Sequence, residues 1–158
     1  MQNLTCLSLV GCLATQYSGW IIAKTPTLRN VRQLDLSDNP VNGLHDWDDT
    51  SLKSIESLRL RGTQFLDQAV PELVKAPFWP NLVELDLRDN PLTGDAAKHF
   101  LAAPRPANLT ALLLNDTRIS ADMLQELQQH FGDDVVLKKA PGEENSSEAR
   151  LSPTGSFG

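Results

Sequence analysis

Apolar and polar residues follow a distinctive order in residues 82–92, whose sequence is LVELDLRDNPL. Leucines occupy the first, fourth, sixth and eleventh positions, and Asn90 occupies the ninth. The fourth and sixth residues are two apart, so they face the same side of an extended strand. The stretch therefore predicts a short strand that ends in a turn.

The same pattern occurs five times along the chain. The copies begin at residues 4, 31, 55, 82 and 109, so successive starts are 27, 24, 27 and 27 residues apart. A regular period of this size is the signature of a repeat architecture, in which neighbouring copies stack and bury a continuous core. We therefore expect the five strands to lie side by side as one parallel sheet.

The ninth position of each copy lies where the chain turns away from the strand. An asparagine there can hydrogen-bond backbone groups that no strand partner reaches, and smaller polar residues can substitute for it. Because free cysteine is usually buried, the cysteine in the first copy is interpreted as a buried structural residue and not as a reactive thiol. We call the five ninth-position residues the ladder, because they are expected to lie one above another in the stack. They are Cys12, Asn39, Thr63, Asn90 and Thr117.

The segments between the strands predict helices on the convex side of the stack. Apolar residues at helical spacing predict four of them. A serine caps the last helix, and a proline in the second must lie in its first turn or kink it. The predicted helices cover residues 16–23, 66–75, 93–102 and 121–131, with Pro71 and Ser120 in these two positions.

Two connections depart from this scheme. Residues 43–50 lack helical periodicity, so we expect a loop or a single 3₁₀ turn in which Trp47 covers the core. Val136 follows Leu109 by one full step of 27 residues and predicts a truncated sixth strand. This strand and the preceding helix would close the C-terminal end of the stack.

The copies resemble the leucine-rich repeat family, whose pattern is L-x-x-L-x-L-x-x-N/C-x-L. The resemblance covers roughly residues 4–137, and steps near 27 are similar to those of the ribonuclease-inhibitor-like subclass. Residues 131–137 also resemble the closing segment of bacterial cytosolic members. The resemblance implies an α/β fold: a right-handed leucine-rich repeat solenoid with a concave parallel β-sheet and a mostly helical convex side.

The repeats define one leucine-rich repeat domain, residues 1–140, with about five repeats and a C-terminal cap. Residues 141–158 lack apolar periodicity and predict a disordered tail. No cap is visible before the first leucine. A fragment, a shortened gene product and a family member with an exposed first edge are all consistent with that feature.

Charge and cysteine content narrow the classes of partner and compartment. With 14 basic and 20 acidic residues, the net charge of −6 disfavours nucleic acid and anionic membranes as partners. No apolar run approaches the roughly 20 residues of a membrane helix. Cys6 and Cys12 would lie roughly 20 Å apart on an extended segment, which is too far for a disulfide. The absence of a disulfide framework in the sequence is typical of a cytoplasmic protein.

A lipoprotein cleavage box offers a second interpretation of residues 9–12, Leu-Val-Gly-Cys. No basic residue precedes it, and the apolar run is short and interrupted. The repeat interpretation is favoured, and processing at Cys12 stays an open alternative.

No catalytic motif is present. His45, His99 and His130 lie outside any recognisable nucleophile arrangement, and phosphate-binding loops, C-x-x-C and H-E-x-x-H are absent from the sequence. Three aspartates beside His45, within residues 46–49, suggest a metal site, but hard cations need six or more oxygens in fixed geometry. A solvated acidic loop is favoured, and we expect no enzyme activity, cofactor or metal.

The family's usual binding surface is the concave face, formed by the third, fifth, seventh and eighth positions of each copy. The partner-binding candidates on it are Asp35, Arg59, Arg61, Glu84, Asp86, Arg88 and Asp89. Because adjacent strands lie about 4.8 Å apart, Arg59 is expected to pair with both Asp35 and Asp86. Arg61 and Arg88 are expected to form a small basic spot.

Two interpretations of this face remain open. The charges neutralise one another on a wet sheet, where such pairs contribute roughly 0–1 kcal/mol each. Alternatively, the arginines select a partner with an acidic protrusion. We expect a monomeric, non-catalytic protein–protein interaction module or scaffold of unknown partner. The alternatives are a regulatory inhibitor or substrate-receptor subunit, or a truncated fragment of a longer repeat protein.

Overall fold

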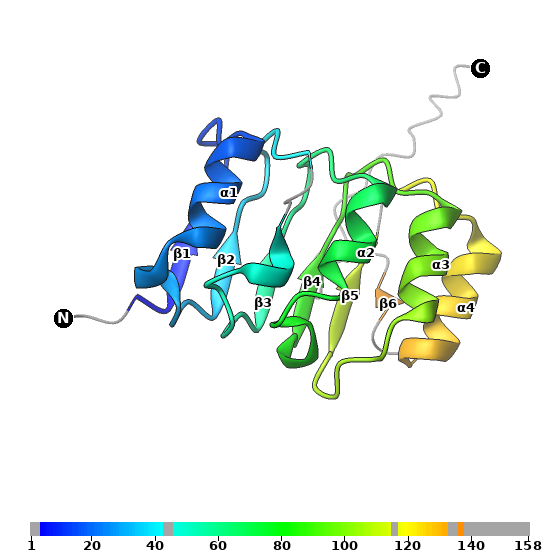
Figure 1. Ribbon diagram of the computed structural model, residues 1–158. Helices are drawn as coiled ribbons and strands as arrows, with labels where there is room; N and C mark the ends of the chain where they lie inside the picture. The colour runs from blue at the N-terminus through cyan, green and yellow to red at the C-terminus, as the bar shows by residue number, and fades with distance from the viewer. Residues whose placement is uncertain (1–3, 43–45, 115–116, 133–135, 138–158) are drawn as a thin grey trace, which may run out of the picture.

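The computed structural model describes residues 4–42, 46–114, 117–132 and 136–137 (Figure 1). In this part of the chain, six parallel strands form one sheet in the order β1-β2-β3-β4-β5-β6. The strands are β1 (Cys6–Ser8), β2 (Gln33–Asp35), β3 (Ser57–Arg59), β4 (Glu84–Asp86), β5 (Ala111–Leu113) and β6 (Val136–Leu137). The helices are α1 (Gln16–Lys24), α2 (Val70–Leu73), α3 (Gly94–Ala102) and α4 (Ala121–Phe131). Short 3₁₀ helices are η1 (Pro26–Leu28), η2 (Trp47–Asp49), η3 (Asp67–Ala69) and η4 (Trp79–Asn81).

Strand register follows the repeat. Leu34 lies opposite Leu58, and Leu85 lies opposite both Leu58 and Leu112. All four of these leucines are buried. Because side chains alternate between the two faces of a strand, the residues on either side of each leucine face away from this core. The alignment of copies and the parallel sheet predicted from the sequence are confirmed.

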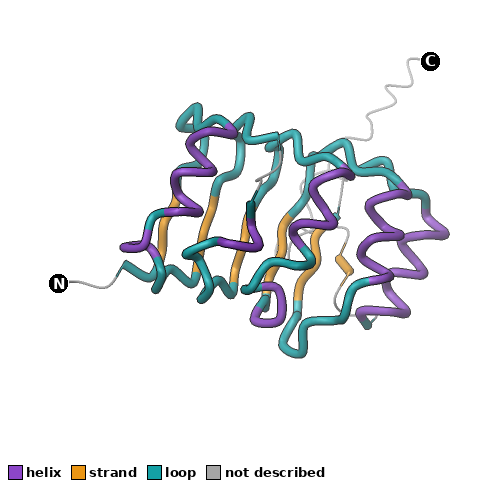
Figure 2. The backbone as a smooth tube through the Cα atoms, in the orientation of Figure 1, coloured by secondary structure: helices purple, strands orange, loops and turns teal. Residues whose placement is uncertain are grey.

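All four α-helices lie on one side of the sheet (Figures 1 and 2). Helices α1, α3 and α4 confirm three of the predicted segments to within a residue or two at each end. The hydroxyl oxygens of Thr93 and Ser120 accept hydrogen bonds from the first-turn amides of α3 and α4, respectively. The opposite face of the sheet has no described helix over it.

The helix predicted over residues 66–75 is shorter than expected. It begins as η3 and continues as α2, which has only four residues. Pro71 lies in the first turn of α2, one of the two outcomes predicted for it, because a proline in a helix interior would remove a backbone hydrogen bond. The Asp67 carboxylate also accepts hydrogen bonds from the Thr93 backbone N–H (2.9 Å) and hydroxyl (2.6 Å). The start of this segment is therefore attached to the next repeat.

Aromatic rings fill the space between the sheet and the outer segments. Trp47, 1% exposed, lies in η2 and contacts Phe78 edge-to-face at a centroid distance of 4.9 Å. Trp79 stacks on Phe100 and donates from its indole nitrogen to the Pro104 carbonyl oxygen at 2.8 Å. The predicted 3₁₀ turn and the covering role of Trp47 are confirmed for residues 46–50, and residues 43–45 fall outside the described residues.

The sixth strand exists, but its register differs from the prediction. Val136 lies opposite Leu112, the fourth position of the fifth copy, and not opposite Leu109, the first position. The connection through α4 is therefore three residues shorter than the usual step, so the closing strand enters further along β5. The predicted tail, residues 141–158, falls outside the described residues.

Candidate functional site

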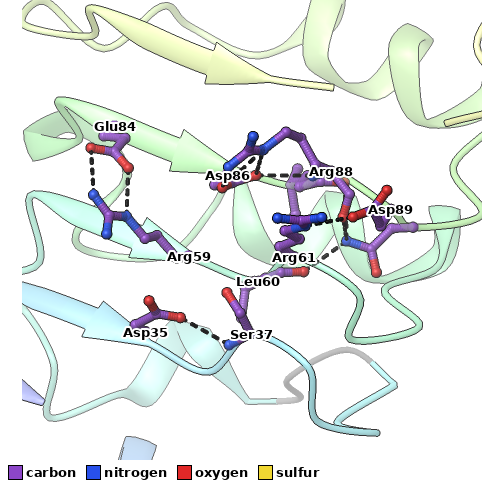
Figure 3. A network of polar contacts seen from close by, with 11 residues as sticks. Asp35, Ser37, Arg59, Leu60, Arg61, Glu84, Asp86, Arg88 and Asp89 are labelled. Carbon is purple, nitrogen blue, oxygen red and sulfur yellow. Dashed lines mark hydrogen bonds and ion pairs between the residues drawn. The ribbon is translucent and has the colours of Figure 1, made fainter. Parts of the chain in front are cut away.

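The candidate binding residues lie on the helix-free face of the sheet, in β2, β3, β4 and the turns that follow them (Figure 3). The register places Arg59 opposite Asp35 on one neighbouring strand and opposite Asp86 on the other. Ser57 lies opposite Glu84. The structure thus brings the predicted residues together on one surface, and their role in partner binding stays a prediction.

Arg59 does not make the pairs expected from its position. Its Nε donates to the Glu84 carboxylate at 2.7 Å, and a second guanidinium nitrogen lies 3.4 Å from the other oxygen of that carboxylate. The hydrogen bond to Glu84 raises the pKa of Arg59, partial burial opposes this, and the charges of Asp35 and Asp86 add a smaller increase. The predicted bridge to both aspartates is wrong because the longer Glu84 side chain reaches the guanidinium.

Asp86 instead pairs within its own repeat, with Arg88 in the turn after β4. Its Oδ2 accepts from Arg88 Nη2 at 2.8 Å, and its Oδ1 accepts from the Arg88 backbone N–H at 3.1 Å. The side chains are 4% and 14% exposed, respectively, so this pair is largely shielded from water. Removing one partner of such a shielded pair destabilises the folded protein, because the charge of the other partner then stays buried.

Arg61 donates from Nε to the Asp89 carboxylate in the turn after β4. This hydrogen bond and the charge of Asp89 raise the pKa of Arg61, while slight burial and the nearby Arg88 lower it. Arg61 and Arg88 therefore lie near each other, but each is paired with a carboxylate. The arrangement matches the interpretation in which charges on this face neutralise one another, and not an isolated basic spot.

A hollow of about 420 Å³ lies over these side chains. Asp35 borders it, with Oδ1 accepting from the Ser37 backbone N–H at 3.0 Å. Ser37 and Asp38 also line the hollow, although they are not among the binding candidates predicted from the sequence. The signal was available, because they occupy the seventh and eighth positions of the second copy.

The two ladder asparagines are buried and join neighbouring repeats. Asn90 Nδ2 lies 2.7 Å from the Leu60 carbonyl oxygen, and Asn90 Oδ1 accepts from the backbone N–H groups of Thr63 (3.0 Å) and Phe65 (2.9 Å). All three partners belong to the preceding copy. Asn39 repeats the arrangement with the first copy, through the Leu9 carbonyl and the Ala14 N–H. These contacts agree with the predicted structural role of both asparagines.

The smaller ladder residues differ among themselves. The hydroxyls of Thr63 and Thr117 each donate to a carbonyl three residues earlier, in Leu60 and Leu114. Cys12 is exposed, and its thiol lies 3.5 Å from the Val10 carbonyl oxygen. The prediction that Cys12 is buried is therefore wrong. Among the described strands, β1 has a neighbour on one side only, so no described repeat covers the turn that holds Cys12.

The remaining polar residues form no recognisable chemical centre in the described ranges. His99 is exposed, the His130 ring lies 3.2 Å from the Ala103 carbonyl oxygen, and His45 falls outside the described residues. Among residues placed by the structure, no group of three or more His, Cys, Asp or Glu side chains is suited to a metal ion. No helix in the same part of the chain has the length and hydrophobicity to cross a bilayer.

Comparison with known proteins agrees with the geometry. The family model described as Leucine Rich Repeat matches residues 81–101, which include β4, its turn and most of α3. No curated protein matches the chain. The family match and the repeated strand register support a leucine-rich repeat protein.

Proposed function

We propose that this protein is a non-catalytic interaction module that binds a protein partner through the helix-free face of its sheet. In this proposal, residues 1–140 form a single right-handed solenoid, and the sheet face is its concave side. The observation that carries the proposal is the charged hollow of about 420 Å³ over β2, β3 and β4. Charged groups fixed in register across several strands favour orientation and selection of a partner.

The proposal is tested by reversing charge on the face without touching the buried Arg88–Asp86 pair. Arg59 and Arg61 are about half exposed, so Arg59→Glu with Arg61→Glu should leave the core intact. The matched control is Lys75→Glu with Lys98→Glu, which makes the same charge change at exposed positions on the helical side. Quantitative affinity capture from the native cell type should lose a partner with the face variant and retain it with the control.

An unchanged set of captured partners for the face variant would overturn the concave-face proposal. Equal loss with both variants would also overturn it, because net charge and not the face would then determine binding. If the protein is a regulatory inhibitor or a substrate receptor, it must also form a stable stoichiometric complex with its partner. Size-exclusion chromatography of the captured material would reveal such a complex.

A further inference from the structure

The charges on the sheet face are not balanced from one end to the other. Each of the three arginines has a hydrogen-bonded carboxylate on this face. These pairs are Arg59–Glu84, Arg61–Asp89 and Arg88–Asp86. Two further carboxylates, Asp35 and Asp38, line the hollow at the β2 end, and no described Lys or Arg side chain makes an ion pair with either. The β2 end therefore carries an excess of negative charge.

The two carboxylates are held in place from the protein side. One Asp35 oxygen accepts from the Ser37 N–H, and its other oxygen accepts no hydrogen bond from a described residue. Asp38 has a positive φ of 57°, and a Cβ added to Gly62 would come within 3.0 Å of its Oδ1. Asp38 therefore lies against the backbone of the next turn, where the glycine leaves room for it. Asp35 and Asp38 attract Arg59 and Arg61, respectively, but both guanidinium groups are hydrogen-bonded elsewhere.

Ser37 supplies an independent observation at the same place. It is only 7% exposed, it lines the hollow, and its hydroxyl makes no hydrogen bond with any described residue. The hydroxyl oxygen is not among the described side-chain atoms that are sealed from solvent without a partner, so it stays accessible from the hollow. A donor that enters the hollow can therefore hydrogen-bond it.

An anion is a poorer match for this surface. It would have to replace carboxylates that already hydrogen-bond the arginines, and it would face the two aspartates at close range. A cation meets two carboxylates and one hydroxyl without breaking any existing pair. Val10, 45% exposed at the edge of the hollow, can contact the methylene stem of a long basic side chain.

We propose that Asp35, Ser37 and Asp38 form a site for a cationic side chain, a lysine or arginine, presented by the protein partner. This proposal rests on the proposed function and specifies the chemistry of the partner. It reverses the expectation of an acidic protrusion at Arg61 and Arg88. The partner's ammonium or guanidinium group donates to both carboxylates and to the Ser37 hydroxyl, and its stem lies toward Val10.

The site can be probed in the full chain with two small ions. The n-butylammonium ion stands for a basic side chain of the partner, and butyrate stands for an acidic one. In ¹⁵N-labelled protein, n-butylammonium should shift the amide signals of Ser37, Asp38 and Gly62 along saturable curves. Raising the salt concentration from about 0.05 to about 0.5 M should weaken these shifts, because salt screens the attraction between butylammonium and the two carboxylates. Butyrate at the same concentrations should leave the three signals unchanged.

The decisive variant is Asp35→Asn with Asp38→Asn. Both changes keep the side-chain shape and the acceptor for the Ser37 N–H, and asparagine tolerates the positive φ at position 38. It should lose the butylammonium shifts while its other amide signals stay in place. The control, Asp48→Asn with Glu126→Gln, removes two exposed negative charges in η2 and α4 and should keep the shifts.

Three results would overturn the site: unsaturable shifts, shifts that persist in the Asp35/Asp38 variant, or saturable butyrate binding at the same amides. Partner capture separates this failure from that of the proposed function. If capture depends on Arg59 and Arg61 but not on the two aspartates, the interaction module stands and the cation site fails. If butylammonium binds as expected but no partner depends on the face, the site stands and the proposed function fails.

Discussion

The turn after β4 and the turn after β1 carry the same repeat position but differ in what they contribute. Asn90, after β4, is 1% exposed and hydrogen-bonds backbone groups of two repeats. Cys12, after β1, is exposed and makes one long contact within its own turn. The difference lies in the neighbour: Asn90 has a preceding repeat to bind, whereas Cys12 follows the edge strand of the described sheet.

The ladder side chains act between repeats as well as within them. Asn39 contacts Leu9 and Ala14 of the first copy, just as Asn90 contacts the third copy. By contrast, the hydroxyls of Thr63 and Thr117 donate to carbonyls of their own copies. The asparagines therefore join the first copy to the second and the third to the fourth. This coupling is a reason for cooperative unfolding of a stack of otherwise similar units.

The largest predicted effect is that of Asn90→Ala. The change leaves several buried backbone donors and acceptors without partners, and each costs free energy. We expect a loss of about 4 kcal/mol in the free energy of unfolding, measured by urea denaturation. Cys12→Ala is the matched control and should change it by less than about 0.5 kcal/mol. Equal effects of the two changes would refute the idea that the preceding repeat gives this position its energetic importance.

A slightly smaller effect is expected at the buried charge pair of the sheet face. Asp86→Ala removes the carboxylate from the Arg88 side chain, which is only 14% exposed, and should destabilise the protein by about 3 kcal/mol. Replacing both residues, as Asp86→Leu with Arg88→Met, should restore part of this loss because no charge then remains buried. Urea denaturation of the three proteins measures both values. A double variant less stable than the single one would contradict this account.

The sequence predicted the parts of the fold that depend on local pattern. The leucines at the fourth and sixth positions determined strand register, and Ser120 marked the start of α4. Prediction from the sequence failed where the contacts or burial of a residue depend on a long side chain or on a neighbouring repeat. Arg59 could reach several carboxylates, and spacing alone did not show that Glu84 would bind it. Cys12 matched the repeat pattern, but its burial depends on a neighbouring repeat, which a pattern within one copy does not encode.

The exposed pair on the sheet face should contribute little to stability. Arg59 and Glu84 have half- and quarter-exposed side chains, with a closest N–O distance of 2.7 Å. In a double-mutant cycle of Arg59→Ala and Glu84→Ala, the coupling free energy should lie at roughly 0–1 kcal/mol. A coupling free energy of about 3 kcal/mol would contradict the solvent screening expected for a pair this exposed.

The smallest effect is expected at the exposed helix pair, and pH distinguishes it from the ladder. The hydrogen bond from Lys98, at 2.7 Å, lowers the pKa of Asp95 in the folded protein. A carboxylate with a lowered pKa stabilises the fold above its unfolded pKa, and this stabilisation is lost as pH falls through the folded pKa. The small Tm difference between wild type and Lys98→Met should therefore be present at pH 7 and shrink as the pH falls below the ordinary pKa of an aspartate.

The Asn90→Ala difference should behave otherwise, because neither the asparagine amide nor its backbone partners titrate in this range. It should persist across the same pH series, measured by thermal denaturation wherever the wild type still folds cooperatively. A Lys98→Met difference that also persisted at low pH would mean that the lysine acts through packing and not through its charge. The pH series therefore separates contacts that join repeats through buried backbone groups from contacts that only adjust charge on the surface.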